Sequence, residues 1–110
     1  MTTHTPFRPV HPSEMLKDEL EYRGISQRKF ADTLGMSYTV LNEILNCKRP
    51  ISTNFALAVE SSLGIPAYIL NNMQAEYNLQ TARKDRTFAY QLRKIHKLAV
   101  AACFYPTELY

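Results

Sequence analysis

A short run of polar residues near the middle of the chain has the side-chain types that hydrogen-bond to nucleobases. Tyr38, Thr39, Asn42 and Glu43 recur at a spacing that places them on the first two turns of one helix. Thr39 offers a hydroxyl and a methyl group suited to thymine, Asn42 can pair with adenine, and Glu43 can accept from the amino group of cytosine. These four residues are candidates for contact with base edges. The alternative is an ordinary solvated helix face.

Cations and helix-terminal polar groups surround this run in the sequence. Lys and Arg neutralise phosphates and release counterions, and the N–H groups at a helix N-terminus favour a phosphate oxygen. The candidates for contact with a sugar–phosphate backbone are Gln27, Arg28, Ser37, Lys48 and Arg49. Solvated surface is the competing interpretation, because Lys and Arg are mostly exposed in any protein. Glu43 has a further alternative: an acid near phosphates is repulsive, so it can instead pair with Lys48 or Arg49.

Two short helices joined by a tight turn must position these residues. Ser26 and Ser37 are good N-caps, and Gly35 supplies the positive φ of the turn between the helices. Gln27 opens the first helix, and the small side chain of Ala31 lets the two helices cross closely. Gly35 permits the turn. Leu41 and Ile44 anchor the second helix to the core. The spacing predicts a helix-turn-helix, which presents the N-terminal end of its second helix to the DNA major groove.

Helical patterns account for most of the remaining sequence, and strand patterns are absent. We expect a first helix that begins at Pro12 and ends at Gly24. A fourth helix is capped by Ser52 or Thr53 and ends at Gly64, and Pro66 begins a fifth. The fold class is therefore all-α.

The expected architecture is a five-helix domain with a C-terminal helical extension. Residues 1–11 form an extended arm, residues 12–80 the helix-turn-helix domain, and residues 81–110 a basic helical extension. A polar hinge over 81–87 precedes a sixth helix, whose apolar positions are Phe88, Leu92, Ile95, Leu98, Ala99 and Ala102.

Length and composition exclude several classes of protein. A chain of 110 residues forms one small domain with some extension, and 45% hydrophobic with 21% charged residues is typical of a globular fold. No apolar run reaches the roughly 20 residues of a membrane span and no secretory signal is evident, so we expect a cytoplasmic protein that does not bind membranes. Cys47 and Cys103 have no metal-binding or disulfide spacing. We find no catalytic constellation and expect neither an enzyme, a metal nor a cofactor.

Charge is divided unevenly along the chain. Residues 1–80 carry seven basic and eight acidic residues, whereas residues 81–110 carry six basic and two acidic residues. A basic amphipathic helix over 83–97 can face DNA, a membrane or a protein. We favour packing of its apolar seam against the rest of the chain or against a second subunit.

The run GISQRKFADTLGMSYTVLNEILNCKRPIS resembles the Cro/repressor (XRE) type of helix-turn-helix. More narrowly, HPSEMLKDEL, NCKRPIS and SLGIPAYILNNMQAEYNL resemble the HPGE start, the NGKR turn and the Leu-Gln-Ala-x-Tyr-x-Leu helix end of HigA antitoxins, over about residues 11–80. The resemblance implies a small repressor that binds its own operator as a dimer. It also implies a partner, the RelE-like ribonuclease toxin HigB encoded beside it. In the family, the positions matching 38, 39 and 43 commonly face base edges.

Two positions depart from the family pattern. Cys47 replaces the glycine usual after the recognition helix, and a left-handed conformation there costs about 1 kcal/mol for a non-glycine residue. Leu70 stands where many HigA-type sequences have tryptophan, and residues 81–110 match no motif.

The sequence therefore predicts a sequence-specific DNA-binding repressor and antitoxin. A two-fold dimer would bring two recognition helices to half-sites of an inverted-repeat operator about 34 Å apart. One alternative is a stand-alone XRE regulator without a toxin. Another is a protein-interaction module with weak DNA binding. A ribonuclease-like toxin gene directly adjacent would favour the antitoxin.

Overall fold

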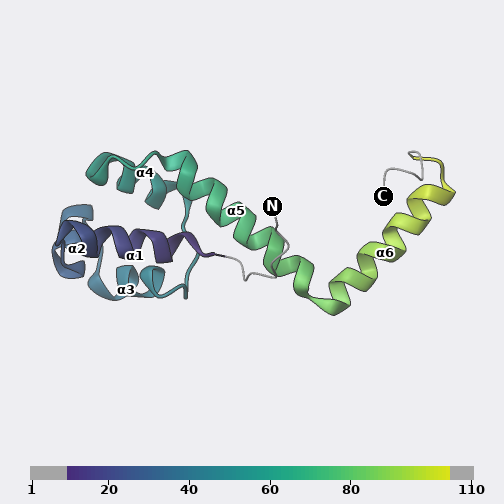
Figure 1. The fold of residues 1–110 in the computed structure, drawn as a ribbon, viewed down its shortest axis with the longest axis horizontal. Coiled ribbons are helices and arrows are strands. Elements are labelled where there is room, and N and C mark those ends of the chain that lie inside the picture. The colour runs from purple at the N-terminus through teal and green to yellow at the C-terminus, as the bar shows by residue number, and fades with distance from the viewer. Residues whose placement is uncertain (1–9, 105–110) are drawn as a thin grey trace. The chain divides into compact units, whose positions relative to one another are not determined.

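The computed structural model describes residues 10–104, and all regular structure in this range is helical (Figure 1). The helices are α1 (Pro12–Arg23), α2 (Gln27–Leu34), α3 (Tyr38–Leu45), α4 (Thr53–Leu63), α5 (Ala67–Lys84) and α6 (Arg86–Ala101). The expected all-α, five-helix domain with a helical extension is confirmed. The expected arm over residues 1–11 lies, apart from its last two residues, outside the described range.

Serine side chains begin three consecutive helices. Ser26, Ser37 and Ser52 each adopt an extended backbone conformation, and each Oγ accepts a hydrogen bond of 3.1 Å from the N–H three residues later. A hydroxyl in this place satisfies one of the N–H groups that a helix start leaves without a partner. The structure selects Ser52 over Thr53 as the cap of α4.

α1 begins differently, with a buried histidine. Nδ1 of His11 accepts a hydrogen bond of 3.1 Å from the N–H of Ser13, and its ring meets Tyr77 of α5 edge-on at 4.7 Å between centroids. His11 is only 3% exposed, so it belongs to the packed domain. Burial lowers the pKa of His11 below its ordinary 6.5, and the nearby charge of Glu14 opposes this shift.

Left-handed residues end the helices that lead into and out of the turn. Gly35 after α2 has φ +70°, and Cys47 after α3 has φ +64°. The N–H of Cys47 donates to the carbonyl of Ile44 (3.1 Å), and the N–H of Lys48 donates to the carbonyl of Glu43 (2.9 Å). This pair of bonds is the Schellman motif. The chain therefore keeps the family's left-handed turn after α3 although it has cysteine in place of glycine.

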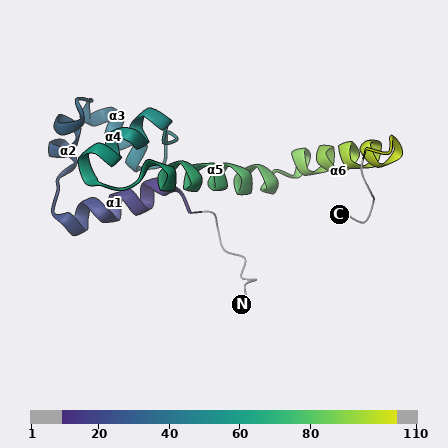
Figure 2. The same ribbon diagram turned by 90° about the horizontal axis from the view of Figure 1, so that it is seen from above.

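A small apolar core holds α3 against its neighbours. α1 to α4 lie together, and the first part of α5 runs beside them (Figures 1 and 2); each of these five helices contributes buried side chains. The largest of these are Phe30, Leu16, Leu20, Leu41, Leu45 and Leu70, each almost completely buried. Burial of a side chain of this size contributes about 1.5–3 kcal/mol. The inward face of α3 is thereby fixed, and so is the face that it turns outward.

A buried glutamine ties α5 to the loop after α3. Oε1 of Gln74 accepts a hydrogen bond of 2.8 Å from the N–H of Ile51, and Nε2 donates to Asn78 at 3.0 Å. Gln74 is 6% exposed and Ile51 is 4% exposed. A buried N–H needs such a partner, so this glutamine holds the segment that carries Lys48 and Arg49.

α6 belongs to a second compact unit, because the chain divides after Asn78. α5 itself continues to Lys84, and Asp85 caps α6 by accepting a hydrogen bond of 3.0 Å from the N–H of Phe88. The break between the helices is thus narrower than the expected hinge over 81–87. Within the described residues, no helix is both long and apolar enough to cross a bilayer.

Candidate nucleic-acid interface

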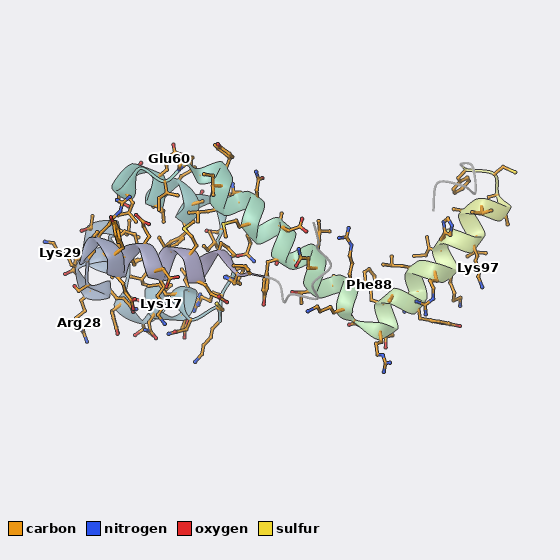
Figure 3. The ribbon with its side chains drawn as sticks, viewed as in Figure 1. Lys17, Arg28, Lys29, Glu60, Phe88 and Lys97 are labelled. Carbon is orange, nitrogen blue, oxygen red and sulfur yellow. The ribbon has the colours of Figure 1, made fainter. Side chains whose placement is uncertain are left out.

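The outward face of α3 carries the predicted base-contacting residues. Leu41, Ile44 and Leu45 of this helix are buried, and the helical period then directs Thr39 and Glu43 to the opposite side. Thr39 is exposed. Tyr38, at the first position of α3, is 37% exposed, and the guanidinium of Arg28 lies 4.4 Å from the centre of its ring. This cation–π contact joins the start of α2 to the start of α3, and Figure 3 shows Arg28 at the surface of the domain.

Asn42 takes part in a chain of hydrogen bonds within the protein. Its Nδ2 donates to Oε1 of Gln27 at 3.1 Å, and its Oδ1 accepts from Nδ2 of Asn46 at 3.1 Å. Asn46 in turn accepts from Nζ of Lys17 at 3.2 Å. Asn42 and Gln27 are half-buried. The structure therefore places Asn42 where it orients Gln27, whose Nε2 can still donate to a phosphate.

Glu43 pairs with a cation from the loop that follows its own helix. Nε of Arg49 donates to Oε1 of Glu43 at 2.6 Å, in a pair that remains about half exposed. This is one of the two partners expected from the sequence. Because this bond is made by Nε, the two Nη groups of Arg49 can donate hydrogen bonds to a phosphate. Pairing also offsets the repulsion between Glu43 and a phosphate backbone.

The other predicted residues lie at the two ends of α3. Ser37 is its N-cap, so its hydroxyl stabilises the helix and its backbone lies at the positive end of the helix dipole. Lys48 is exposed immediately after the left-handed Cys47. Three supporting residues were not expected from the sequence, namely Lys17, Asn46 and Gln74. The partners of Lys17 and Gln74 lie 29 and 23 residues away, so helical periodicity did not reveal them. Asn46 lies one helical turn after its partner Asn42, a spacing that the sequence does show.

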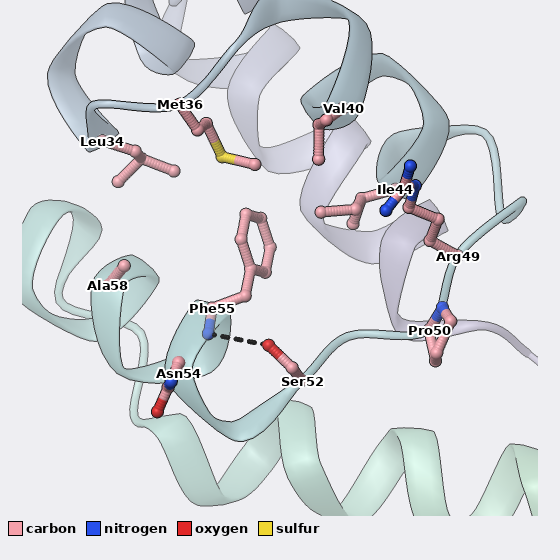
Figure 4. Close-up of a pocket in the computed structure, with 10 residues that line it drawn as sticks. All are labelled: Leu34, Met36, Val40, Ile44, Arg49, Pro50, Ser52, Asn54, Phe55 and Ala58. Atoms are coloured by element: carbon pink, nitrogen blue, oxygen red, sulfur yellow. Dashed lines mark hydrogen bonds between the residues drawn. The ribbon is translucent and has the colours of Figure 1, made fainter.

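An open apolar groove of about 510 Å³ lies between α3, the turn before it and α4 (Figure 4). Phe55 points into it from α4, opposite Met36, Val40 and Ile44. Arg49 and Pro50 line one side. At this groove the base of the loop that carries Arg49 lies next to the N-terminus of α4, where the hydroxyl of Ser52 accepts a hydrogen bond from the N–H of Phe55.

Comparison with known proteins agrees with this arrangement. The helix-turn-helix family matches residues 16–70, which include α2, the turn and α3. Virulence-associated protein I of Dichelobacter nodosus is 35% identical over 78 residues, which cover 70% of this chain and 72% of that protein. The antitoxin HigA of Pseudomonas aeruginosa, solved with the higBA promoter, is 34% identical with a TM-score of 0.68, covering 80% of this chain and 91% of that one. The chain belongs to the HigA type of the helix-turn-helix family.

A second HigA-family structure supports the assignment of the whole domain. An addiction module antidote protein from Coxiella burnetii has a TM-score of 0.72 at 28% identity and covers 80% of this chain and 95% of that chain. The family assignment that the sequence motifs implied is thus confirmed. In this HigA-type chain α6, from Arg86 onward, lies outside the segment that the family matches.

Proposed function

We propose that this HigA-type protein is a DNA-binding repressor that autoregulates its operon. The observation that carries the proposal is the outward face of α3, which exposes Thr39 and the paired Glu43 while the core holds the helix from behind. A relative of 34% identity has been solved with promoter DNA, which supports the same use of this face. The protein acts by binding, without a catalytic step or a cofactor.

The residues divide into two roles at the DNA surface. Tyr38, Thr39 and Glu43 contact base edges, and Asn42 joins them or holds Gln27 in place. The backbone is contacted by Gln27, Arg28, Ser37, Lys48 and Arg49. Arg49 has a double role, because it both neutralises Glu43 and reaches toward phosphate.

Binding to a labelled fragment upstream of the protein's own gene tests this proposal. Each lost base contact costs about 1–3 kcal/mol, so Thr39→Ala combined with Arg49→Ala should weaken specific binding by roughly tenfold or more. Affinity for the specific site should also fall steeply as salt rises. The proposal fails if the double variant is folded and binds as tightly as the wild type.

A matched control separates contact from general damage. Thr33→Ala with Arg23→Ala makes the same two changes at exposed sites, on α2 and α1. Thr33 donates to the carbonyl of Lys29, and Arg23 pairs with Glu19 and donates to the carbonyl of Leu63 at 2.9 Å. The melting temperature of this control therefore has to be compared with that of the wild type. This control should bind the fragment with wild-type affinity, and scrambled DNA should not compete with the specific site.

We further propose that the protein is the antitoxin of a HigBA-like module and neutralises a RelE-like ribonuclease toxin. The support is its membership of the HigA type together with the HigA-family antidote protein that shares its fold. Co-expression with the product of an adjacent toxin-like gene tests it. The antitoxin should co-purify with the toxin and restore growth. A chain that binds its promoter but rescues no neighbouring toxin would be a stand-alone regulator.

A further inference from the structure

We propose that Lys17 and Asn46 set the direction in which Gln27 presents its side-chain amide to DNA, which rests on the proposed function of Gln27 as a phosphate contact. Four side chains form one line of hydrogen bonds that runs from Lys17 on α1 through Asn46 and Asn42 to Gln27 on α2. The successive donor–acceptor distances are 3.2, 3.1 and 3.1 Å. Lys17 and Asn46 are positioning residues in this proposal, because they act on DNA through Gln27.

Two partners that each hydrogen-bond in one direction fix the amide of Asn46. The ammonium of Lys17 can only donate, so it requires Oδ1 of Asn46. The backbone carbonyl of Asn42 can only accept, and it receives a hydrogen bond of 2.9 Å from Nδ2 of Asn46. An amide turned the other way would place N–H groups against the ammonium and an oxygen against the carbonyl. Asn46 therefore has one favourable orientation.

The orientation of Asn46 determines the orientation of the next two amides. Nδ2 of Asn46 also donates to Oδ1 of Asn42, which leaves Nδ2 of Asn42 to face Gln27. This Nδ2 needs an acceptor, so Oε1 of Gln27 is turned toward it. A flip of either amide would bring two donors or two acceptors together. The line therefore ends with Nε2 of Gln27, a donor, directed away from Asn42.

A donor is the group that a phosphate backbone requires. Phosphate oxygens only accept hydrogen bonds, and Gln27 is the first residue of α2, where the backbone N–H groups also favour an anion. A reversed line would present Oε1 of Gln27 to the phosphate, and two acceptors repel each other. A side chain that is oriented before binding also loses less conformational entropy on binding. The line should therefore raise affinity without a contact between Lys17 and DNA.

The core places the first donor of the line beside the end of α3. Leu16 of α1 and Leu41 of α3 are completely buried in the same cluster, which holds the two helices together. Lys17, the residue after Leu16, is half-buried, and its ammonium reaches Asn46 directly after α3. Figure 3 shows Lys17 on the same side of the domain as Arg28. The packing of α1 on α3 is thereby connected to a residue at the DNA surface.

A double-variant cycle of DNA affinity tests the connection. Binding to the fragment upstream of the protein's own gene is compared among the wild type, Lys17→Met, Gln27→Ala and the double variant. Methionine has the helix propensity of lysine but no donor. Lys17→Met alone should raise the dissociation constant about two- to tenfold. In the Gln27→Ala background it should have little further effect, because the end of the line is already lost. Lys17→Arg keeps a donor and should restore most of the affinity.

Lys29→Met is the matched control for the loss of charge. Lys29 is exposed on α2, and the helical period places it about 200° around the helix from Gln27. This variant should bind like the wild type. Equal losses from Lys17→Met with and without Gln27 would overturn the proposal, because Lys17 would then contact DNA itself. Wild-type affinity of Lys17→Met would overturn it as well.

A measurement on the free protein separates this proposal from the DNA-binding proposal. The side-chain amide signals of Gln27 in an NMR spectrum should shift in Lys17→Met and stay unchanged in Lys29→Met. Unchanged signals in Lys17→Met would overturn the line of hydrogen bonds whether or not the chain binds DNA. A wild type that binds scrambled DNA as tightly as its own promoter would instead refute the proposed function.

Discussion

Replacement of Cys47 by glycine should stabilise the N-terminal domain. Cys47 has φ +64°, and the two hydrogen bonds around it have the same pattern as those around Gly35, which has φ +70°. In both turns the left-handed residue donates to the carbonyl three residues before it, and the next residue donates to the carbonyl five residues before its own position. The two turns differ in the residue that adopts the positive φ, so Gly35 serves as an internal reference for Cys47.

The expected size of the effect follows from two opposing costs. A side chain with a Cβ atom loses about 1–2 kcal/mol in the left-handed conformation. Glycine loses about 0.5–1 kcal/mol more conformational entropy on folding than a residue with a side chain. The two ranges give a net gain for Cys47→Gly of about 0–1.5 kcal/mol, with a central value of about 0.75 kcal/mol. In a domain of this size, the central value raises the melting temperature by roughly 3–6 °C.

Urea and thermal unfolding followed by circular dichroism measure this gain. Cys47→Ala is the matched control, because it removes the sulfur and keeps the Cβ atom, and it should unfold close to the wild type. Cys103 has φ +63° at the end of α6, in the other compact unit, so Cys103→Gly should leave the main transition unchanged. Equal stability of Cys47→Gly and Cys47→Ala would refute the strain argument.

Three further predictions concern buried polar groups. Burial lowers the pKa of His11. The contribution of neutral His11 to stability should therefore be complete above about pH 6.5 and be lost as the pH falls through the lowered pKa. The urea midpoints measured at about pH 7.5 and about pH 5.5 should differ less in His11→Asn than in the wild type, because asparagine keeps a capping acceptor but does not titrate. Gln74→Ala leaves the buried N–H of Ile51 without its acceptor and should lower the free energy of unfolding in urea by about 1–3 kcal/mol. An unchanged urea midpoint would show that this hydrogen bond does not stabilise the domain. Oγ of Ser13 is buried without a hydrogen-bond partner among the described residues, so Ser13→Ala should be neutral or stabilise the protein by up to about 1 kcal/mol, and a clear loss in melting temperature would show that the hydroxyl has a partner.

The sequence was most informative where the determining interactions are local. The caps at Ser26 and Ser37 and the turn at Gly35 depend on contacts within three to five residues, and the amphipathic spacing of α2 to α4 reports their buried faces directly. These features were confirmed. The left-handed turn at Cys47 also follows from the family pattern, and the structure retains it without the glycine.

Contacts between residues distant in sequence were not predictable in the same way. The bond from Gln74 to Ile51 spans 23 residues, and the bond from Lys17 to Asn46 spans 29. Polar residues on a helix have no periodic signal that identifies a partner on another helix. Asn42 illustrates the consequence: its position on α3 suits a base, but its side chain meets Gln27 across the α2–α3 interface.

The single residue between α5 and α6 has a consequence for operator geometry. No glycine or proline occurs from Ala67 to Ala101. The capping bond of Asp85 supports the break between the helices, and such a cap contributes about 1 kcal/mol. A constraint of that size holds a joint only weakly. If the two DNA-binding domains of an operator-bound dimer are linked through such joints, we expect the dimer to accept half-sites at more than one separation. Inserting base pairs between the half-sites should then reduce affinity gradually, whereas a rigid dimer would lose it at the first insertion.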